Sequence, residues 1–286
     1  MSAPRSPLSY ASDGMSAARQ RFLRFVEWTY GVDEASRRYE EWRAGFAGYR
    51  GDAMNRLLAV YDIRLDLHGA AWPPPRDPRR PLLMVANHPF GVPDGIAILA
   101  LGERLGRPVK ILINTDLLRI PEMAPFSLPI DFSDSRDAMR INAASGREAV
   151  ARLQAGETIA IFPSGGVATA GWPFGPAGDL PWKTFAAKLV HKARADVAPL
   201  YFAGQNSWLF QAASQVSLFL RLSLLVPEAL RRVGRPLEVH AGPILPYEDL
   251  EPVTDRRALT DLLRRRIFAL APAGTPRDRI GKLRVA

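Results

Sequence analysis

Two residues six positions apart, His88 and Asp94, have the types and the spacing needed for acid–base chemistry. The histidine follows a short apolar run, 81–86, which is rich in strand formers and predicts a buried strand. Asp94 suits the first turn of a helix that we expect to continue to Leu105, where a carboxylate is favourable and can turn back toward the histidine. Because a carboxylate can orient a neutral imidazole, this pair could deprotonate a hydroxyl group at neutral pH.

The alternative for His88 is a polar residue at a strand end, solvated or hydrogen-bonded to a neighbouring backbone group. Two features favour a catalytic role. Ligands of open α/β sheets bind at the carboxyl ends of the strands, which is where this histidine is expected. Pro89, Gly91 and Pro93 then restrict or specialise the backbone up to Asp94, as expected of a loop that must hold a fixed shape. The sequence therefore predicts His88 as a general base oriented by Asp94.

The same residues carry a family resemblance. Asn87-His88 followed by Asp94 resembles the first motif of the glycerolipid and lysophospholipid acyltransferase superfamily, in which most members have four residues between the histidine and the aspartate. This chain has five, and the longer spacing resembles the branch of hemolysin-like acyltransferases related to ornithine-lipid synthesis. The resemblance implies an acyltransferase in which His88 and Asp94 are catalytic and Asn87 lies at the substrate.

A second candidate element follows the apolar run 158–162, where Ser164, Gly165 and Gly166 predict a tight turn. The two glycines allow the backbone to approach a ligand closely, and their amides could bind an anion; the alternative is a plain turn. The segment is similar to the Phe-Pro-Glu-Gly-Thr-Arg motif of the superfamily, which places the turn at the substrate, but Ser164 replaces the acid and no arginine follows. Since an arginine grips phosphate with two parallel hydrogen bonds, its absence weakens the case for a phosphatidate-type acceptor.

A substitute cation could come from segment 129–136, which lies where the superfamily carries its second motif. Arg136 is the first candidate for binding an anionic head group or the phosphate of an acyl donor, and Arg140 is the second. The alternative for both is a solvent-exposed arginine on a helix. Segments 181–191 and 197–207 resemble the helix before the fourth motif of the hemolysin-like branch and that motif itself.

The composition is that of a globular protein with a basic surface, because 47% of the 286 residues are hydrophobic, 23% are charged and the formal net charge is +9. Such a charge favours an anionic partner, and nucleic acid, an anionic membrane and an acidic carrier protein all qualify. No basic stripe interleaved with aromatic residues is present, so no nucleic acid is expected. The absence of cysteine excludes disulfides and cysteine nucleophiles. No metal is expected, because the histidines and carboxylates lack the clustered spacing of a metal site.

Apolar patterning divides the chain into three parts. Residues 1–14 are polar, lack the apolar core of a secretion signal and predict a disordered leader. Residues 15–69 predict an N-terminal helical annex of two amphipathic helices broken near Gly31, and 70–286 predict an α/β domain with a mixed, largely parallel central sheet flanked by helices. Strands are expected at 82–86, 109–113, 158–162, 198–202 and 237–241. Helices are expected at 95–105, 146–155 (with a capping box at Ser145 and Glu148), 182–195, 208–225 and 255–270.

No stretch of the chain reaches the roughly 18 uninterrupted apolar residues of a membrane-spanning helix. The nearest candidate, 216–226, is interrupted by Arg221 and predicts a buried core helix, with a helix lying against lipid as the alternative. We therefore expect a cytoplasmic protein that associates peripherally with the inner face of the membrane.

Together with the resemblance, these features predict an O-acyltransferase that moves a fatty acyl group from a thioester to the hydroxyl of a lysolipid, either lyso-ornithine lipid or lysophosphatidate. Acyl-CoA or acyl carrier protein would be the co-substrate, and no cofactor is expected. Backbone amides at Gly165 and Gly166 would stabilise the oxyanion. A lipid or ester hydrolase is less favoured because the chain has no Gly-x-Ser-x-Gly elbow. The remaining alternative, a non-catalytic basic peripheral membrane protein of the same fold, would leave the loop of His88 and Asp94 without a purpose.

Overall fold

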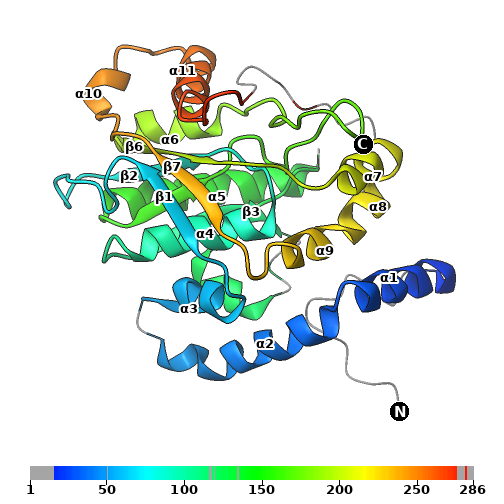
Figure 1. The fold of residues 1–286 in the computed structure, drawn as a ribbon. Coiled ribbons are helices and arrows are strands. Elements are labelled where there is room, and N and C mark those ends of the chain that lie inside the picture. Colours follow the sequence, from blue (N-terminus) through cyan, green and yellow to red (C-terminus); the bar gives the residue numbers. More distant parts are fainter. Residues whose placement is uncertain are drawn as a thin grey trace.

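The computed structural model describes residues 16–49, 51–115, 118, 120–133, 135–275 and 281, so the leader expected at 1–14 lies outside the described residues. Its centre is a seven-stranded sheet with the strand order β1-β7-β6-β2-β5-β3-β4 (Figure 1). The strands are β1 (Leu65–Gly69), β2 (Leu82–Ala86), β3 (Val109–Asn114), β4 (Ser127–Ile130), β5 (Thr158–Ile161), β6 (Asp196–Phe202) and β7 (Leu237–Ala241).

Neighbouring strands pair in parallel except β6 and β7, which pair antiparallel. The mixed, largely parallel sheet predicted from the sequence is therefore confirmed. Two strands were not predicted, and they are β1 and β4, the two edges of the sheet. β1 falls within the segment expected as helical annex, yet Leu65 pairs with Leu237. Its pattern is weak because no residue of β1 is fully buried and polar residues alternate with Leu65 and Leu67.

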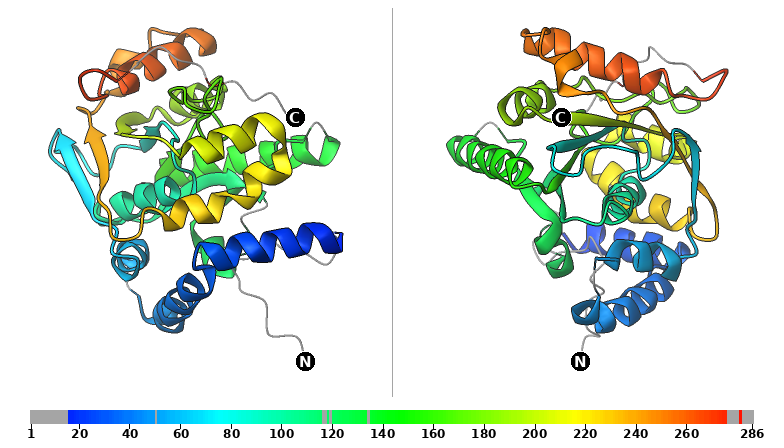
Figure 2. Two further views of the ribbon diagram at one scale, coloured as in Figure 1. Left: turned by 45° about the vertical axis from the view of Figure 1, so that its right-hand side comes forward. Right: turned by 90° about the vertical axis from the view of Figure 1, so that its left-hand side faces the viewer.

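Helices cover both faces of the sheet (Figures 1 and 2). They are α1 (Ala17–Thr29), α2 (Val32–Gly45), α3 (Ala53–Val60), α4 (Val92–Glu103), α5 (Arg136–Gln154), α6 (Phe185–Ala193), α7 (Trp208–Val216), α8 (Leu218–Ser223), α9 (Leu225–Leu230), α10 (Tyr247–Leu250) and α11 (Arg256–Phe268), with the 3-10 turns η1 (Phe46–Gly48) and η3 (Pro121–Phe126). Along β2, Leu82 and Met84 pack with α3 and α4, whereas Leu83 and Val85 pack with α5, α6 and α11. Because both faces are covered, the central strand is a continuous apolar run.

The two helices predicted for the annex are present, and they join at Gly31, whose φ of +70° suits glycine. α2 is fastened to η3 by the buried carboxylate of Glu122, which accepts a hydrogen bond from the Tyr39 hydroxyl. α1 lies alongside α8, where the rings of Phe22 and Phe219 are 6.3 Å apart (Figure 2). The annex is thereby placed beside the helices that follow β6.

The capping box predicted at Ser145 is wrong. α5 begins at Arg136, and the Ser135 side chain caps it by accepting a hydrogen bond from an amide of the first turn at 2.9 Å. Ser145 lies inside this helix, where its buried hydroxyl donates to the Pro129 carbonyl of β4 at 2.6 Å. The Ser145 hydroxyl therefore bonds to a neighbouring strand, whereas the sequence pattern predicted that it would cap the start of a helix.

The single helix expected over 208–225 is divided into α7, α8 and α9. Ser217 has extended backbone angles and separates α7 from α8. The side chain that turns inward here is Arg221, whereas Val216 and Leu218 are 68% and 42% exposed. The prediction of one buried core helix around Arg221 is therefore wrong, because the polar residue faces the interior and part of the apolar surface faces out.

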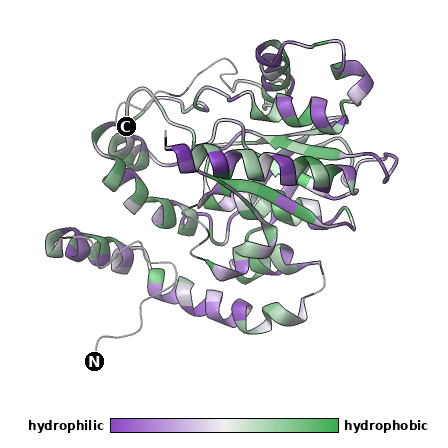
Figure 3. Cartoon of the chain, turned by 180° about the vertical axis from the view of Figure 1, so that it is seen from behind, coloured by the Kyte–Doolittle hydropathy of each residue, from purple (hydrophilic) through white to green (hydrophobic). Residues whose placement is uncertain are grey.

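Hydropathy follows the layers of the fold. The central strands are apolar, whereas polar and apolar residues mix along α1 (Figure 3). α1 buries Leu23 and Val26 but leaves Phe25 and Trp28 exposed, at 64% and 73%. Within the described part of the chain, no helix combines the length and the apolarity needed to cross a bilayer.

Candidate active site

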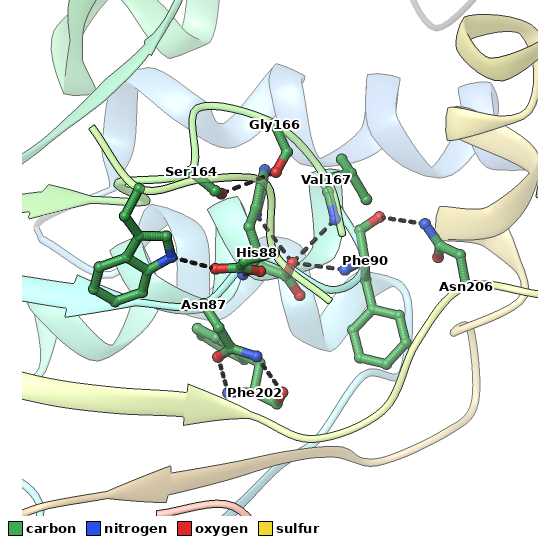
Figure 4. A network of polar contacts seen from close by, with 12 residues as sticks. Asn87, His88, Phe90, Ser164, Gly166, Val167, Phe202 and Asn206 are labelled. Atoms are coloured by element: carbon green, nitrogen blue, oxygen red, sulfur yellow. Dashed lines mark hydrogen bonds and ion pairs between the residues drawn. The ribbon is translucent and has the colours of Figure 1, made fainter. Parts of the chain in front are cut away.

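His88 follows the central strand β2, and Asp94 lies in the first turn of α4, as the sequence predicts. The imidazole Nδ1 lies 3.1 Å from Asp94 Oδ2, a hydrogen-bond distance without hydrogen-bond alignment. Asp94 Oδ2 also accepts hydrogen bonds from the amides of Phe90 and Gly91, at 2.8 and 3.0 Å, so this fully buried carboxylate shapes the loop that carries the histidine (Figure 4). Catalytic contacts of this kind often tighten only when substrate binds.

The imidazole of His88 stacks on the ring of Phe162, with the centroids 4.1 Å apart and 19° between the planes. Phe162 directly follows β5, which pairs with β2. The two elements singled out in the sequence therefore meet at adjacent strand ends. The His88 side chain is 16% exposed, so it is shielded from bulk water and still accessible.

The backbone of His88 is held on both sides by the loop 163–184. Its carbonyl accepts a hydrogen bond from the Ala168 amide at 2.8 Å, and its amide donates to Asp179 Oδ1 at 3.0 Å. Asp179 Oδ2 accepts the indole N–H of Trp182 at 2.8 Å. Burial raises the pKa of Asp179 to about 6, although these hydrogen bonds and the charge of His88 act to lower it. Asp179 was not predicted from the sequence; the available signal is an acid beside a tryptophan in a loop rich in glycine and proline.

A cavity of about 610 Å³ extends from His88 between the sheet and the annex. Apolar side chains of α2, α3, α4, α9 and β3 make up most of its lining, among them Trp42, Leu57, Ile96, Ile111, Leu225 and Leu230. Apart from His88, the described residues with charged side chains that line it are Asp131 and Lys183, and Lys183 Nζ lies 4.1 Å from the centre of the Phe132 ring. Among the residues that the structure describes, no three histidine or carboxylate side chains gather to hold a metal ion.

Asn87, expected at the substrate, joins two strands instead. Its side-chain amide donates to the Phe202 carbonyl at 2.9 Å and accepts a hydrogen bond from the Phe202 amide at 2.7 Å (Figure 4). The side chain is buried and does not line the apolar cavity. Asn87 therefore ties the end of β2 to the end of β6, and its role at the substrate stays a prediction.

Arg136 and Arg140, expected to bind an anionic group, are exposed on α5, and neither lines the cavity. The Arg140 side chain is 83% exposed and pairs with Asp137 at 3.2 Å. The cation that the structure places at the cavity is Lys183, from the loop before α6. Its position depends on how that loop folds back over β5, which no local pattern in the sequence indicates.

Ser164, Gly165 and Gly166 form the tight turn predicted from the sequence. Ser164 Oγ donates to the Gly166 carbonyl at 2.9 Å, and the Gly165 amide donates to the Phe162 carbonyl at 3.0 Å. Because the Gly165 amide is already used, it does not face an oxyanion in this conformation, which corrects the expectation for that residue. Of the three turn residues only Gly165 lines the cavity, so an oxyanion role for the Gly166 amide stays a prediction.

A buried arginine also holds the loop 163–184. Arg221 is 6% exposed and donates to the Val167 carbonyl at 2.8 Å and to Ser214 Oγ at 2.9 Å. Burial lowers its pKa to about 10, and within the described residues no carboxylate forms an ion pair with it. Arg221 was not predicted as a site residue, although an arginine inside an apolar run is the signal that could have indicated it.

The segment after β6 contacts the His88 loop as well. The side-chain amide of Asn206 donates to the Phe90 carbonyl at 3.4 Å (Figure 4). Ser207 begins α7 as its N-cap, and its own amide donates to the buried carboxylate of Glu228 at 2.8 Å. The segments that resemble the first motif, the Phe-Pro-Glu-Gly-Thr-Arg motif and the fourth motif thus converge on one loop.

A family model described as Acyltransferase matches residues 67–203, a stretch that includes His88 and Asp94. A lyso-glycine lipid O-acyltransferase of Phocaeicola vulgatus is 29% identical over 177 residues, which are 58% of this chain and 60% of that protein. A protein of the same name from Bacteroides thetaiotaomicron is 28% identical over 177 residues, which are 58% of this chain and 61% of that protein. The matched part thus spans about three fifths of these relatives.

Among solved structures, the crystal structure of the 1-acyl-sn-glycerophosphate acyltransferase of Thermotoga maritima aligns with a TM-score of 0.46 and 17% identity, over 92% of this chain and 91% of that one. The family model and the two relatives agree with the motif resemblance, and the model covers the strand ends where the site is built. The family model and the two relatives thus support the resemblance of this chain to the glycerolipid/lysophospholipid acyltransferase superfamily.

Proposed function

We propose that this protein is an O-acyltransferase that transfers a fatty acyl group from a thioester to the hydroxyl of a lysolipid. The observation that carries the proposal is the pairing of His88 with Asp94 at the end of an apolar cavity. The cavity volume of about 610 Å³ lies within the range of pockets that bury small ligands, roughly 300–1,000 Å³. Its lining suits a hydrocarbon chain, because burial removes apolar surface from water on both sides.

In the proposed reaction, His88 Nε2 takes the proton of the acceptor hydroxyl while the hydroxyl oxygen attacks the thioester carbonyl carbon. The carbon–sulfur bond then breaks, and the thiolate takes the proton back from the imidazolium and leaves as a thiol. Asp94, beside Nδ1, holds the tautomer that keeps Nε2 unprotonated and stabilises the imidazolium. The mechanism requires no acyl-enzyme, in keeping with a chain that has no cysteine.

The acceptor in this proposal is a lysolipid with a carboxylate head group, of the acylated amino acid type, such as lyso-glycine lipid or lyso-ornithine lipid. Two observations support a carboxylate over a phosphate. The arginine expected after the turn at Ser164 is absent, and among the residues that the structure describes the single lysine or arginine that lines the cavity is Lys183. A lysine acts as one point charge, whereas phosphate recognition often uses the planar fork of an arginine. The names of both relatives agree with this choice.

The donor is acyl-CoA or an acyl carrier protein, and the protein works as a peripheral protein at the inner, cytoplasmic face of the membrane. The support for this location is α1, which exposes Phe25 and Trp28 next to basic side chains. Aromatic and basic residues on one helix favour the boundary of an anionic bilayer. The exposed basic residues of α1 are Arg19, Arg21 and Arg24.

The test is transfer of labelled palmitoyl from CoA and carrier-protein thioesters to lyso-glycine lipid, lyso-ornithine lipid and lysophosphatidate. Wild type is compared with His88→Ala, and His68→Ala on the edge strand β1 is the matched control. We expect transfer to a carboxylate lysolipid by wild type and by the control, and a loss of about 10²- to 10⁴-fold in His88→Ala. A folded wild type that binds vesicles but transfers nothing would instead indicate a non-catalytic membrane protein.

A further inference from the structure

Asp179 lies in the loop between β5 and α6 and is 1% exposed. Each of its carboxylate oxygens has one neutral donor, the amide of His88 at 3.0 Å and the indole of Trp182 at 2.8 Å. The residue does not line the apolar cavity; it borders a separate cavity of about 210 Å³ together with Tyr201. Any effect of Asp179 on chemistry in the apolar cavity must therefore act through His88.

The bond from the His88 amide to Asp179 restrains the loop that carries the imidazole. Together with the bond from the Ala168 amide to the His88 carbonyl, at 2.8 Å, it fixes the peptide groups on both sides of this residue. The imidazole Nδ1 faces Asp94 at 3.1 Å. His88 thus has one carboxylate beside its ring and another beside its backbone.

We infer that Asp179 is a positioning residue for the general base: in its ionised form it holds the His88 loop through the backbone amide and adds a second negative charge that favours the imidazolium. The inference rests on the proposed function, in which His88 accepts the proton of the acceptor. A charged acceptor makes the amide hydrogen bond stronger than a neutral acceptor would. A buried carboxylate also acts on a nearby cation more strongly than it would in water.

The ionisation of Asp179 gives the restraint a pH dependence. Burial raises the pKa of Asp179 to about 6, while the hydrogen bonds from His88 and Trp182 and the positive charges of His88 and of Arg264 on α11 oppose that rise. Among the residues that the structure describes, Tyr201 is the other titratable side chain that borders the small cavity. We therefore expect acyl transfer to increase as the pH rises through about 6, because the charged restraint forms in that range.

The test compares wild type with Asp179→Asn and with the double variant Asp179→Asn/Trp182→Phe. If the asparagine turns its oxygen to the His88 amide, its NH₂ group faces the indole N–H of Trp182, and two donors oppose each other. Trp182→Phe removes the indole N–H and with it this conflict. Asp249→Asn, an exposed carboxylate on α10, is the matched control. The measurements are kcat and KM as functions of pH, and Tm at about pH 8.

For Asp179→Asn we expect kcat to fall about 10- to 100-fold, with KM for the lysolipid changed less than about threefold because Asp179 is not in the cavity. The acid limb of the pH–rate profile should move to lower pH. Tm at about pH 8 should change little, because the removal of a buried charge offsets the cost of the two donors that face each other. The double variant should regain at least about threefold in kcat over Asp179→Asn.

Two results overturn the inference: wild-type kcat in Asp179→Asn, or a kcat that falls together with Tm on an unshifted pH profile. If wild type itself transfers no acyl group, the proposed function fails, and the ¹⁵N resonance of the His88 amide decides about Asp179. A resonance that titrates near pH 6 in wild type and not in Asp179→Asn supports the restraint. A His88 amide that shows no such titration overturns it.

Discussion

Buried carboxylates lie at both ends of the central sheet, and the two ends hold them differently. At the amino end, Asp196 of β6 is 3% exposed and accepts two hydrogen bonds from the Arg80 guanidinium, at 2.6 and 2.9 Å. At the carboxyl end, Asp94 and Asp179 are 0% and 1% exposed and accept hydrogen bonds from backbone amides and an indole. In the part of the chain that the structure describes, no lysine or arginine lies within ion-pair distance of these two.

The difference separates a structural charge from a functional one. A guanidinium that binds a carboxylate with two hydrogen bonds cancels its charge and fixes its geometry, so Asp196 fastens the start of β6 to Arg80. Amides and an indole donate to the oxygens of these carboxylates, except Asp94 Oδ1, which has no hydrogen-bond partner, and they leave the negative charge of each carboxylate in place. That charge is then available to the His88 imidazole, which becomes positive during the proposed proton transfer.

The largest effect expected from this comparison is the loss of activity in Asp94→Asn. The asparagine still offers an oxygen to the amides of Phe90 and Gly91, so the loop should keep its shape. It removes the charge that stabilises the His88 imidazolium, and kcat should fall about 10³- to 10⁴-fold. Acyl transfer and Tm are measured together; a kcat within about tenfold of wild type in a folded variant would show that this carboxylate is structural.

The next effect is on the pH dependence of stability in Asp179→Asn. Burial raises the pKa of Asp179 from its ordinary value of 3.8 to about 6. Its contribution to stability is therefore complete below about pH 4 and is lost as the pH rises through about 6. The shift corresponds to roughly 3 kcal/mol.

Asp179→Asn has no carboxyl group to titrate, so it should not lose this stability as the pH rises. The unfolding free energy of the variant minus that of wild type should therefore increase between about pH 4 and pH 7.5. Urea unfolding at the two pH values measures the difference. Parallel changes in the two proteins would mean that Asp179 titrates in the native state as it does in the unfolded chain.

A smaller effect, confined to stability, is expected for Asp196→Asn at the amino end. The change weakens the paired hydrogen bonds to Arg80, which keeps Glu248 as a second partner at 2.6 Å. Because Arg80 is partly exposed, the cost should be about 1–3 kcal/mol, seen as a lower Tm. The kcat should stay within about twofold of wild type, since the residue lies at the opposite end of the strands from His88. A large loss of kcat at unchanged Tm would contradict the division between the two ends.

Local patterns in the sequence were sufficient for the parts of the site that lie on continuous elements. The apolar run 82–86 became β2 with those bounds, and His88 with Asp94 followed it as predicted. The run at 158–162 became β5, and its turn meets the His88 loop because neighbouring parallel strands end at the same edge. Periodicity and motif spacing carry this information because it is encoded within a few consecutive residues.

Residues that act through the folding of a long loop could not be predicted in the same way. Asp179 lies in a segment without periodicity, and Lys183 lies near the start of the helix expected at 182–195, which begins at Phe185. The neighbours of both residues are set by how 163–184 folds back across the strand ends. Arg136 had the expected residue type and place in the chain, yet α5 starts there and presents it to solvent. Asn87 also had the right neighbours, but its amide groups are used by the backbone of β6. Type and spacing indicate chemistry, whereas burial and partners decide which residue performs it.

The smallest expected effect concerns Lys183, and it tests whether this cation at the cavity binds the head group of the substrate. Lys183→Ala should raise KM for a lysolipid with a carboxylate head group about tenfold, the value of roughly one charge-assisted hydrogen bond, and leave kcat within about threefold because His88 is untouched. Lys192→Ala, an exposed lysine at the end of α6, is the control. If Arg140→Ala raises KM and Lys183→Ala does not, the head group binds over α5. Asp94 and Asp179 would then still be without an ion-pair partner among the described residues. The anionic head group would be bound by Arg140 on α5, outside the cavity described here.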